Sequence, residues 1–209
     1  RDRIFLTTKV MQDRFADGTA LESAKVSADK LGGPVDLLLV HWPPKGVETL
    51  AVIDALEEIR AAGLTTHIGV SNFNVPMLTA AAGRATILTN QVEFHALIDQ
   101  ARLKAAADAL GVRLTAYMPI ARGRVFAEAP VAAAAERLDK TPAQIALRWI
   151  VQQGVTAIPM STKTANLQAN LAVTEFALSD AEMAAITALT KGHQRFCEPY
   201  DWAPEWDAA

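Results

Sequence analysis

Residues 35–44 of the chain read VDLLLVHWPP, and this stretch decides the interpretation of the fold. Leu37 to Val40 form a continuous apolar run, which is typical of a strand buried on both faces of a parallel sheet. Pro43 ends the strand because proline has no N–H to donate to a neighbouring strand. His41 and Trp42 lie between the apolar run and the proline, so the expected strand ends on a histidine beside a tryptophan.

Similar apolar or β-branched runs recur along the chain and alternate with alanine-rich segments of helical periodicity. In the helical segments apolar residues fall three and four positions apart, as at Ala55, Leu56 and Ile59. This alternation predicts the α/β class with helices covering a parallel sheet, either a doubly wound sheet or a (β/α)8 barrel. We expect strands at residues 4–9, 35–42, 67–72, 89–94, 113–120 and 155–161, and helices at 19–31, 49–62, 75–82, 98–110, 128–138, 142–153, 164–171 and 179–190.

The length of the chain, 209 residues, suits one α/β domain. Six expected strands are two fewer than a closed barrel of eight needs, and the chain reaches a strand within a few residues of Arg1. We therefore expect residues 1–209 to form a single (β/α)8 TIM-barrel domain that is incomplete at its N-terminus. It would contain six strands and their helices, with the first two βα units absent.

Composition and charge exclude several classes of protein. A formal net charge of −3 gives no positive surface for nucleic acid or for an anionic membrane. No apolar run approaches the roughly 18 residues that a membrane-spanning helix needs, and no signal peptide is visible. The single cysteine, Cys197, cannot form a disulfide within the chain, which fits a reducing compartment and predicts a cytoplasmic protein.

Polar side chains stand at the carboxyl end of every expected strand. In a parallel barrel these ends converge on one mouth, where active sites lie. Taken singly, each residue has a structural explanation: a lysine is usually a solvated charge, a histidine can be satisfied in the core, and a Ser-Asn pair commonly forms a turn or helix cap. Together they predict an active site that contains Lys9, His41, Ser71, Asn72, Gln91, Tyr117 and Ser161.

The segment IPMSTKTANLQANL, residues 158–171, places hydroxyl side chains and a lysine before a short expected helix. A helix N-terminus with Ser161, Thr162 and Lys163 beside it favours an anion, and barrels often bind phosphate after their last strands. We therefore expect a phosphate-bearing ligand, although a capped helix alone would also explain the pattern. The chain lacks GxGxxG, GxxxxGKS/T, HExxH, paired cysteines and GxSxG, so we expect no Rossmann domain, P-loop, metal site or serine-hydrolase elbow.

At these residues the sequence resembles the aldo-keto reductase family. The tail RFCEPYDWAPEWD resembles its bacterial 2,5-diketo-D-gluconate reductase branch, in particular the B type, which also reduces methylglyoxal-like aldehydes. The resemblance implies a (β/α)8 barrel, acting as a monomer, that reduces aldehydes, ketones and keto-sugar acids to alcohols by hydride transfer from NADPH. The matching segments, in family order, are RDRIFLTTKV around Lys9, VDLLLVHWP around His41, IGVSNFNVPML at residues 68–78, TNQVEFH around Gln91, TAYMPIARG around Tyr117, and IPMSTKTANLQANL.

The resemblance also implies a role for each residue of the predicted site. Lys9 corresponds to the catalytic lysine of the family and His41 to its catalytic histidine, while the family's proton donor is a tyrosine whose pKa a nearby ammonium lowers. The other residues are implied to bind the nicotinamide carboxamide (Ser71, Asn72, Gln91), the nicotinamide ring (Tyr117, with Met118 and Ile120 beside it), the adenosine and its 2′-phosphate (Ser161, Thr162, Lys163, Asn170), and the substrate (Trp42, Phe73, Trp202).

Two departures from the family pattern leave alternatives open. The family's donor tyrosine and its aspartate partner precede the strand of Lys9, and neither Tyr117 nor Tyr200, the two tyrosines of this chain, matches the donor. Met160 and Asn166 stand where many members carry Lys and Arg beside the 2′-phosphate, so NADH stays an alternative cofactor. The alternative functions are a nucleotide-binding barrel without catalysis and, through amine attack by Lys9, a Schiff-base lyase.

Overall fold

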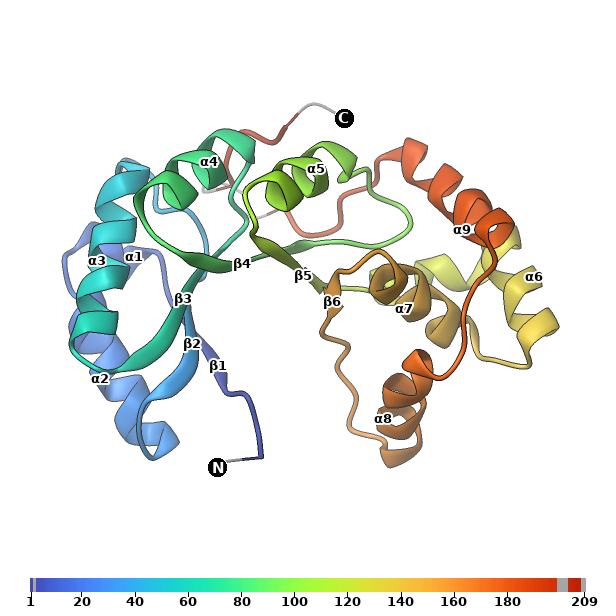
Figure 1. The fold of residues 1–209 in the computed structure, drawn as a ribbon, viewed down its shortest axis with the longest axis horizontal. Helices are drawn as coiled ribbons and strands as arrows, with labels where there is room; N and C mark the ends of the chain where they lie inside the picture. Colours follow the sequence, from blue (N-terminus) through green and yellow to red (C-terminus); the bar gives the residue numbers. More distant parts are fainter. Residues whose placement is uncertain (2, 199–202, 208–209) are drawn as a thin grey trace. The chain divides into compact units, whose positions relative to one another are not determined.

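The computed structural model describes residues 1, 3–198 and 203–207. Its strands and helices alternate along the chain, as the sequence predicts (Figure 1). Within the described residues, no helix is both long enough and apolar enough to cross a membrane. The strands are β1 (Thr7–Val10), β2 (Val35–Val40), β3 (Thr65–Ser71), β4 (Ile87–Glu93), β5 (Arg113–Tyr117) and β6 (Thr156–Ala157). The helices are α1 (Asp13–Ala16), α2 (Ala20–Leu31), α3 (Thr49–Ala61), α4 (Val75–Arg84), α5 (Ala101–Ala109), α6 (Ala129–Leu138), α7 (Pro142–Gln152), α8 (Thr164–Leu171) and α9 (Asp180–Thr187), with 3-10 helices η1 (Ala121–Ala127), η2 (Ala172–Thr174) and η3 (Ala188–Gly192).

The chain forms two compact units. Of the described residues, the first unit holds 1, 3–91, 102–113 and 203–207, and the second holds 92–101 and 114–198. Strands β1, β2, β3 and β4 pair in parallel in the first unit, and β5 pairs in parallel with β6 in the second. These parallel strands and their helices confirm the α/β class. The single domain over residues 1–209 stays a prediction.

The first unit packs around β2, whose residues from Leu37 to Val40 are each at most 5% exposed. Helix α3 contacts both β2 and β3, and α2 contacts β1, so helices cover these strands (Figure 1). Burial of one large aliphatic side chain contributes roughly 1.5–3 kcal/mol, which explains why β2 is apolar on both faces. The buried face of α3 has the predicted helical spacing and consists of Val52, Ile53, Leu56 and Ile59.

The second unit is organised around α7, whose start is fixed by a capping box. The hydroxyl of Thr141 accepts the backbone N–H of Gln144 at 3.2 Å, and the side-chain oxygen of Gln144 accepts the backbone N–H of Thr141 at 3.1 Å. Pro142 occupies the first helical position, where no N–H is needed. Trp149 on α7 is buried, and its indole N–H donates to the hydroxyl of Thr187 on α9 at 3.0 Å. The bond between Trp149 and Thr187 joins α7 to α9.

The last strand is much shorter than predicted. The sequence predicts a strand over residues 155–161, whereas β6 contains only Thr156 and Ala157. Pro159 has no N–H with which to extend the ladder, and the residues beyond it form a loop before α8. Ser161 therefore lies in this loop and not at the end of a strand.

Other element ends differ from the prediction by a few residues. Strand β5 stops at Tyr117 and not at residue 120, because Met118 has a left-handed backbone (φ 50°) that cannot continue a strand. Strand β1 begins at Thr7 rather than residue 4, β2 ends at Val40 rather than residue 42, and β3 and β4 each begin two residues earlier and end one residue earlier than predicted. Helix α5 begins at Ala101 rather than residue 98, α4 ends two residues later and α9 three residues earlier than predicted, and the short helix α1 was not predicted.

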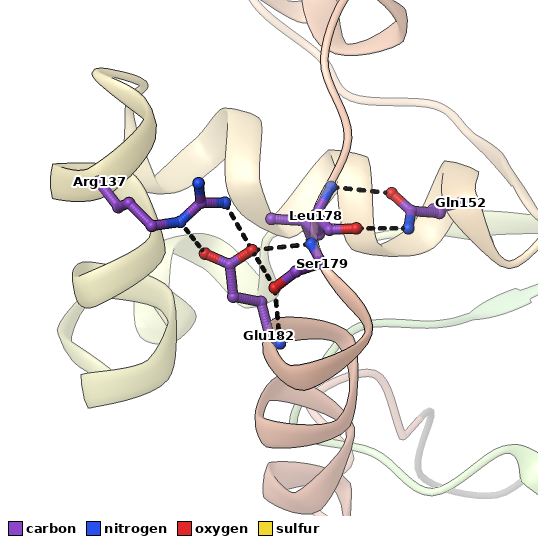
Figure 2. Close-up of polar contacts among 5 residues, drawn as sticks. All are labelled: Arg137, Gln152, Leu178, Ser179 and Glu182. Atoms are coloured by element: carbon purple, nitrogen blue, oxygen red, sulfur yellow. Dashed lines mark hydrogen bonds and ion pairs between the residues drawn. The ribbon is translucent and has the colours of Figure 1, made fainter.

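A carboxylate fixes the start of α9 in the second unit (Figure 2). Glu182 accepts the backbone N–H and the hydroxyl of Ser179, both at 2.8 Å, and two guanidinium N–H groups of Arg137 on α6, both at 2.7 Å. Nearby, the side chain of Gln152 on α7 exchanges two hydrogen bonds with the backbone of Leu178. The bond from Arg137 lowers the pKa of Glu182, burial raises it, and the bonds from Ser179 lower it further, to about 2.

Replacing Glu182 with Gln is expected to lower the free energy of unfolding at neutral pH by about 1–2 kcal/mol, because an amide donor replaces an acceptor oxygen. Since the folded-state pKa lies below the ordinary 4.5, the stabilisation is fully present above that value and is lost as the pH falls toward 2. Urea denaturation at neutral and acidic pH measures this difference. The control is Glu22→Gln on α2, whose exposed carboxylate lies 3.3 Å from Lys25; an equal loss there would contradict the prediction.

Candidate active site

Polar side chains gather in the first unit where β1, β2, β3 and β4 end. Lys9 is the penultimate residue of β1, His41 directly follows β2, Ser71 ends β3 with Asn72 behind it, and Gln91 lies near the end of β4. The strands are parallel, so their carboxyl ends meet at the same edge of the sheet. The structure therefore brings together five of the residues that the sequence predicts.

Lys9 is a half-buried cation beside a histidine. Burial lowers the pKa of the Lys9 ammonium, and among the described residues this ammonium has no ion-pair partner. Burial and, second, the charge of Lys9 lower the pKa of His41, so its imidazole is neutral at neutral pH. The backbone N–H of His41 donates to the carbonyl of Val10 at 2.9 Å, and its Nδ1 lies 3.1 Å from the sulfur of Met11. A cation and a neutral polar ring suit a place where negative charge develops.

Ser71, Asn72 and Gln91 are buried polar residues, each at most 5% exposed. The hydroxyl of Ser71 donates to the backbone carbonyl of Gln91 at 2.7 Å, and Nδ2 of Asn72 donates to that hydroxyl at 3.2 Å. Asn72 has a left-handed backbone (φ 62°), which asparagine tolerates better than most residues. Within the described part of the chain, the side-chain amide of Gln91 has no hydrogen-bond partner. Buried amides and a hydroxyl offer the donors and acceptors that a carboxamide ligand needs.

Two of the three residues predicted to contact substrate are buried in the first unit. Trp42 directly follows His41, and Phe73 follows Asn72. The ring of Trp42 packs edge-to-face against the ring of Trp206, with centroids 6.1 Å apart. Trp202 lies outside the described residues.

Trp206 belongs to a C-terminal segment that is bound to the start of α4. Nδ2 of Asn74 donates to the carbonyl of Glu205 at 2.8 Å, and the carboxylate of Asp207 accepts the backbone N–H of Val75 at 2.9 Å. A carboxylate at a helix N-terminus is stabilised by the helix dipole. The sequence reasoning missed the role of Asp207, because its partner lies 132 residues away along the chain.

In the second unit, Tyr117 ends β5 and leads into an unusual loop, in which Met118 and Ile120 are half-buried. Burial raises the pKa of the Tyr117 hydroxyl, and the nearby Cys197 and Glu93 raise it further, so the hydroxyl stays protonated. Left-handed backbone conformations cost energy for residues other than glycine and cluster at functional sites. In this loop they occur at Met118, Ala121 and Arg122.

Ser161, Thr162 and Lys163 form the loop before α8, and Thr162 and Lys163 are exposed. The backbone N–H of Lys163 donates to the hydroxyl of Ser161 at 3.1 Å. In the described structure, α8 has no side-chain cap, so its first N–H groups are available to an anion. Asn170 lies on the same helix. The helix predicted at residues 164–171 is confirmed, whereas the strand predicted to end at Ser161 is wrong.

These two groups of residues belong to different units. Lys9, His41, Ser71, Asn72 and Gln91 lie in the first unit, and Tyr117 and the loop before α8 lie in the second. One cofactor site formed by both groups therefore stays a prediction. Among the described residues, no cluster of three His, Cys, Asp or Glu side chains is placed to hold a metal ion.

A buried carboxylate in the second unit, Glu93, is one of the polar residues expected at a strand end, but no role in the site was predicted for it. Glu93, at the end of β4, is fully buried and accepts hydrogen bonds from His95 at 2.9 Å and from the backbone N–H groups of Phe196 and Cys197 at 2.7 and 2.9 Å. A signal for it exists in the segment QVEFHALI, where an acidic residue interrupts an apolar run. A charge in such a place needs buried partners.

Comparison with known proteins identifies the class. The sequence profile of the Aldo/keto reductase family matches residues 1–191. The chain therefore belongs to the aldo-keto reductase family, as the strand-end motifs predict.

Individual relatives cover nearly the whole chain. Methylglyoxal reductase DkgB of Yersinia pestis is 37% identical in an alignment of 214 positions, which covers 99% of this chain and 79% of the relative. A solved structure named 2,5-diketo-D-gluconic acid reductase B has 42% identity and a TM-score of 0.95, over 100% of this chain and 75% of that chain. Bombyx mori aldo-keto reductase, solved in complex with NADP, has 29% identity and a TM-score of 0.85, over 93% of this chain and 70% of that chain. The predicted fold class and the resemblance to the B-type branch are thus confirmed.

Proposed function

We propose that this chain reduces aldehydes and ketones to alcohols, with NADPH as the reductant. The observation that carries the proposal is the cluster in the first unit: Lys9 without an ion pair among the described residues, the neutral His41 beside it, and the buried Ser71, Asn72 and Gln91. Membership in the aldo-keto reductase family supports it. So do the names of the relatives, which are reductases of methylglyoxal and of 2,5-diketo-D-gluconic acid.

The polar groups of the first unit fit a nicotinamide carboxamide, which has one carbonyl acceptor and one NH2 donor. Gln91 presents an amide with both kinds of group, and Ser71 adds a hydroxyl. The NH2 of Asn72 donates to that hydroxyl and to the backbone carbonyl of His41, so Asn72 links the hydroxyl to the end of β2. The backbone N–H of Asn72 donates to the carbonyl of Gln91 at 3.0 Å, so the backbone that carries the amide is already fixed. NADPH, when bound, supplies the hydride that reduces the carbonyl carbon.

At the substrate, the protein contributes orientation and charge. As the carbonyl oxygen gains negative charge, the neutral imidazole of His41 donates an N–H to it, and the ammonium of Lys9 stabilises the same charge. The alkoxide that hydride transfer forms must then take up a proton. In the family a tyrosine gives this proton and the lysine lowers its pKa; neither tyrosine of this chain matches that donor, so here we assign Lys9 only the stabilisation of charge and the tuning of whichever donor completes the site. Because Lys9 is held by β1 and His41 by its bond to Val10, both groups are in place before the reaction.

Small carbonyl compounds are the substrates that we propose, with methylglyoxal and keto-sugar acids first. Trp42 is next in sequence to His41, and its ring packs against that of Trp206 to form an apolar surface in the first unit. An apolar surface with few polar groups suits a small ligand. We also propose that the protein acts as a monomer and that it works in the cytoplasm. The free thiol of Cys197 fits the reducing conditions of that compartment.

The proposal is tested by following NADPH absorbance in the presence of methylglyoxal, 2,5-diketo-D-gluconate and a panel of simple aldehydes and ketones. We expect NADPH consumption that depends on the carbonyl compound and yields the corresponding alcohol. The assay uses the full-length protein without any substitution. Binding of NADPH without turnover on any of these carbonyls would favour the alternative of a nucleotide-binding barrel without catalysis.

The loop before α8 is proposed to bind the 2′-phosphate of NADPH. Replacing Lys163 with Ala is expected to raise the dissociation constant for NADPH by about tenfold, because a charge-assisted bond to phosphate is lost. The dissociation constant for NADH, which lacks this phosphate, is expected to stay the same. Fluorescence titration with both cofactors measures the difference. The control is Lys191→Ala, on the exposed side of η3; equal loss of NADPH and NADH affinity in Lys163→Ala would count against the assignment.

One observation favours a second candidate function, a Schiff-base lyase. Burial lowers the pKa of Lys9, and a lower pKa increases the fraction of the nucleophilic amine. Borohydride treatment in the presence of a carbonyl substrate would then attach the substrate covalently to Lys9. We expect mass spectrometry to show no adduct, because a Schiff-base lyase binds no nicotinamide and would not need the polar residues proposed to bind the carboxamide.

A further inference from the structure

Glu93 is a fully buried carboxylate whose partners come largely from the C-terminal part of the second unit. Its Oε1 accepts the backbone N–H of Phe196 at 2.7 Å and Nε2–H of His95 at 2.9 Å, and its Oε2 accepts the backbone N–H of Cys197 at 2.9 Å. The guanidinium of Arg195, only 9% exposed, lies 3.9 Å from Oε2 and balances the charge. Burial raises the pKa of Glu93, but the hydrogen bonds outweigh burial and leave it lowered, so the carboxylate is ionised at neutral pH.

The side chains around Glu93 reinforce these bonds. The backbone N–H of Leu97 donates to Nδ1 of His95 at 3.2 Å, so Nδ1 is an acceptor and Nε2 carries the proton that is donated to Glu93. The rings of His95 and Phe196 stack with centroids 5.3 Å apart. The guanidinium carbon of Arg124 lies 4.3 Å from the centroid of the Phe196 ring. Glu93 is therefore the centre of a packed polar cluster.

Cys197 connects this cluster to Tyr117. The thiol of Cys197 lies near the hydroxyl of Tyr117 and contributes to the raised pKa of that hydroxyl. At its other end, the carbonyl of Tyr117 accepts the backbone N–H of Phe94, the residue after Glu93, at 3.3 Å. The backbone of Tyr117 is thus bound by the residue next to Glu93, and its hydroxyl lies near a segment that Glu93 itself binds.

We propose that Glu93 is a positioning residue for the nicotinamide end of the cofactor site. It binds residues 195–197, and Cys197 in turn holds the hydroxyl of Tyr117, so that the ring of Tyr117 presents a fixed face to the nicotinamide. Glu93 itself touches neither cofactor nor substrate. This inference rests on the proposed function, because the role of Tyr117 is part of it.

The chemistry of the cluster requires a carboxylate at position 93. Glutamine has nearly the same shape, but one of its two terminal groups is an NH2 donor in place of an acceptor oxygen. That donor would face the backbone N–H of Phe196 or that of Cys197, and two donors cannot bond. Arg195 would also lose the negative charge of a buried carboxylate 3.9 Å away, which is costly. We therefore expect Glu93→Gln to release residues 195–197 from their position.

The test compares Glu93→Gln with Glu182→Gln in binding two ligands, each followed by tryptophan fluorescence. The ligands are NADPH and ADP-ribose 2′-phosphate, which lacks the nicotinamide. Glu182 is a matched control in the same unit, since it also binds a backbone N–H and an arginine. Glu93→Gln is expected to weaken NADPH binding about three- to tenfold and to leave ADP-ribose 2′-phosphate binding unchanged. Glu182→Gln is expected to change neither; equal weakening of both ligands in Glu93→Gln would overturn the inference.

Cys197 provides a second measurement that needs no ligand. It is the single cysteine, so its rate of reaction with a disulfide reagent reports whether residues 195–197 stay in place. We expect a rate about tenfold higher in Glu93→Gln, because local release exposes the thiol, and an unchanged rate in Glu182→Gln. An unchanged rate in a folded Glu93→Gln protein would overturn the inference.

If Glu93→Gln does not fold, Cys197→Ala tests the same link from its other end. This variant keeps the backbone N–H that Glu93 accepts and removes the thiol near the hydroxyl of Tyr117. It is expected to show the same selective loss of NADPH affinity, and unchanged NADPH affinity would overturn the inference. Failure of the proposed function is distinguishable, since an unmodified protein that binds neither NADPH nor NADH would refute it before any variant is compared.

Discussion

Replacing Lys9 with Met is expected to lower kcat/KM for carbonyl reduction by about 10³-fold, the size of effect typical for loss of a group that assists proton transfer and charge stabilisation. Methionine has a similar length but no charge, so the change removes the ammonium while keeping most of the packing at the end of β1. The affinity for NADPH is expected to stay within about twofold, because the lysine acts on the transition state and not on the bound cofactor. Steady-state kinetics and fluorescence titration measure the two quantities separately.

Two further variants define what the loss in Lys9→Met means. Lys30→Met, in the last turn of α2 on the exposed surface, removes a positive charge away from the site and should leave kcat/KM unchanged. Lys9→Arg keeps the charge but cannot form an imine, so a reductase should retain part of its activity and a Schiff-base lyase none. A large fall in NADPH affinity in Lys9→Met, with kcat unchanged, would show that Lys9 binds cofactor and would contradict its catalytic role.

The residues of the first unit could be predicted because their signal is local. Each follows or ends a short apolar run, as His41 follows Leu37 to Val40, and parallel strands bring their carboxyl ends to one edge. No long-range contact has to be known to reach that conclusion. Asn72 was predicted as the last residue of the third strand, whereas it follows β3 with a left-handed backbone that cannot continue a strand.

The parts that were missed depend on distant partners. Glu93 appears as one polar residue at a strand end, and what makes it a buried anchor is a pair of backbone N–H groups 103 and 104 residues further on. The length of β6 depends on its neighbour, since only Thr115 and Ala116 of β5 pair with it. An apolar run such as residues 155–161 shows that a segment can be a strand, but not how much of it finds a partner.

Gly69 in β3 has the least space of any glycine in the described chain. A Cβ at this position would lie 2.5 Å from Cδ2 of Leu39 in β2 and 2.8 Å from the backbone carbonyl oxygen of Thr89 in β4. The side chain of Leu39 could rotate, but the carbonyl of Thr89 cannot move without shifting β4. The register between β3 and β4 is irregular at this point, between Ile68 and Val70. Glycine is therefore required here for close approach of the two strands.

Replacing Gly69 with Ala is expected to lower the free energy of unfolding by about 2–3 kcal/mol, because an added methyl group forces strands apart in a packed core. Ser71 ends the same strand and Asn72 directly follows it, so NADPH affinity should fall as well. Gly83→Ala on α4 is the matched control: nothing lies within 4 Å of its Cβ, and alanine in a helix should stabilise by roughly 0.5–1 kcal/mol. Urea denaturation of both variants measures the difference. A Gly69→Ala protein as stable as the Gly83→Ala control would mean that β3 and β4 are further apart than this structure places them.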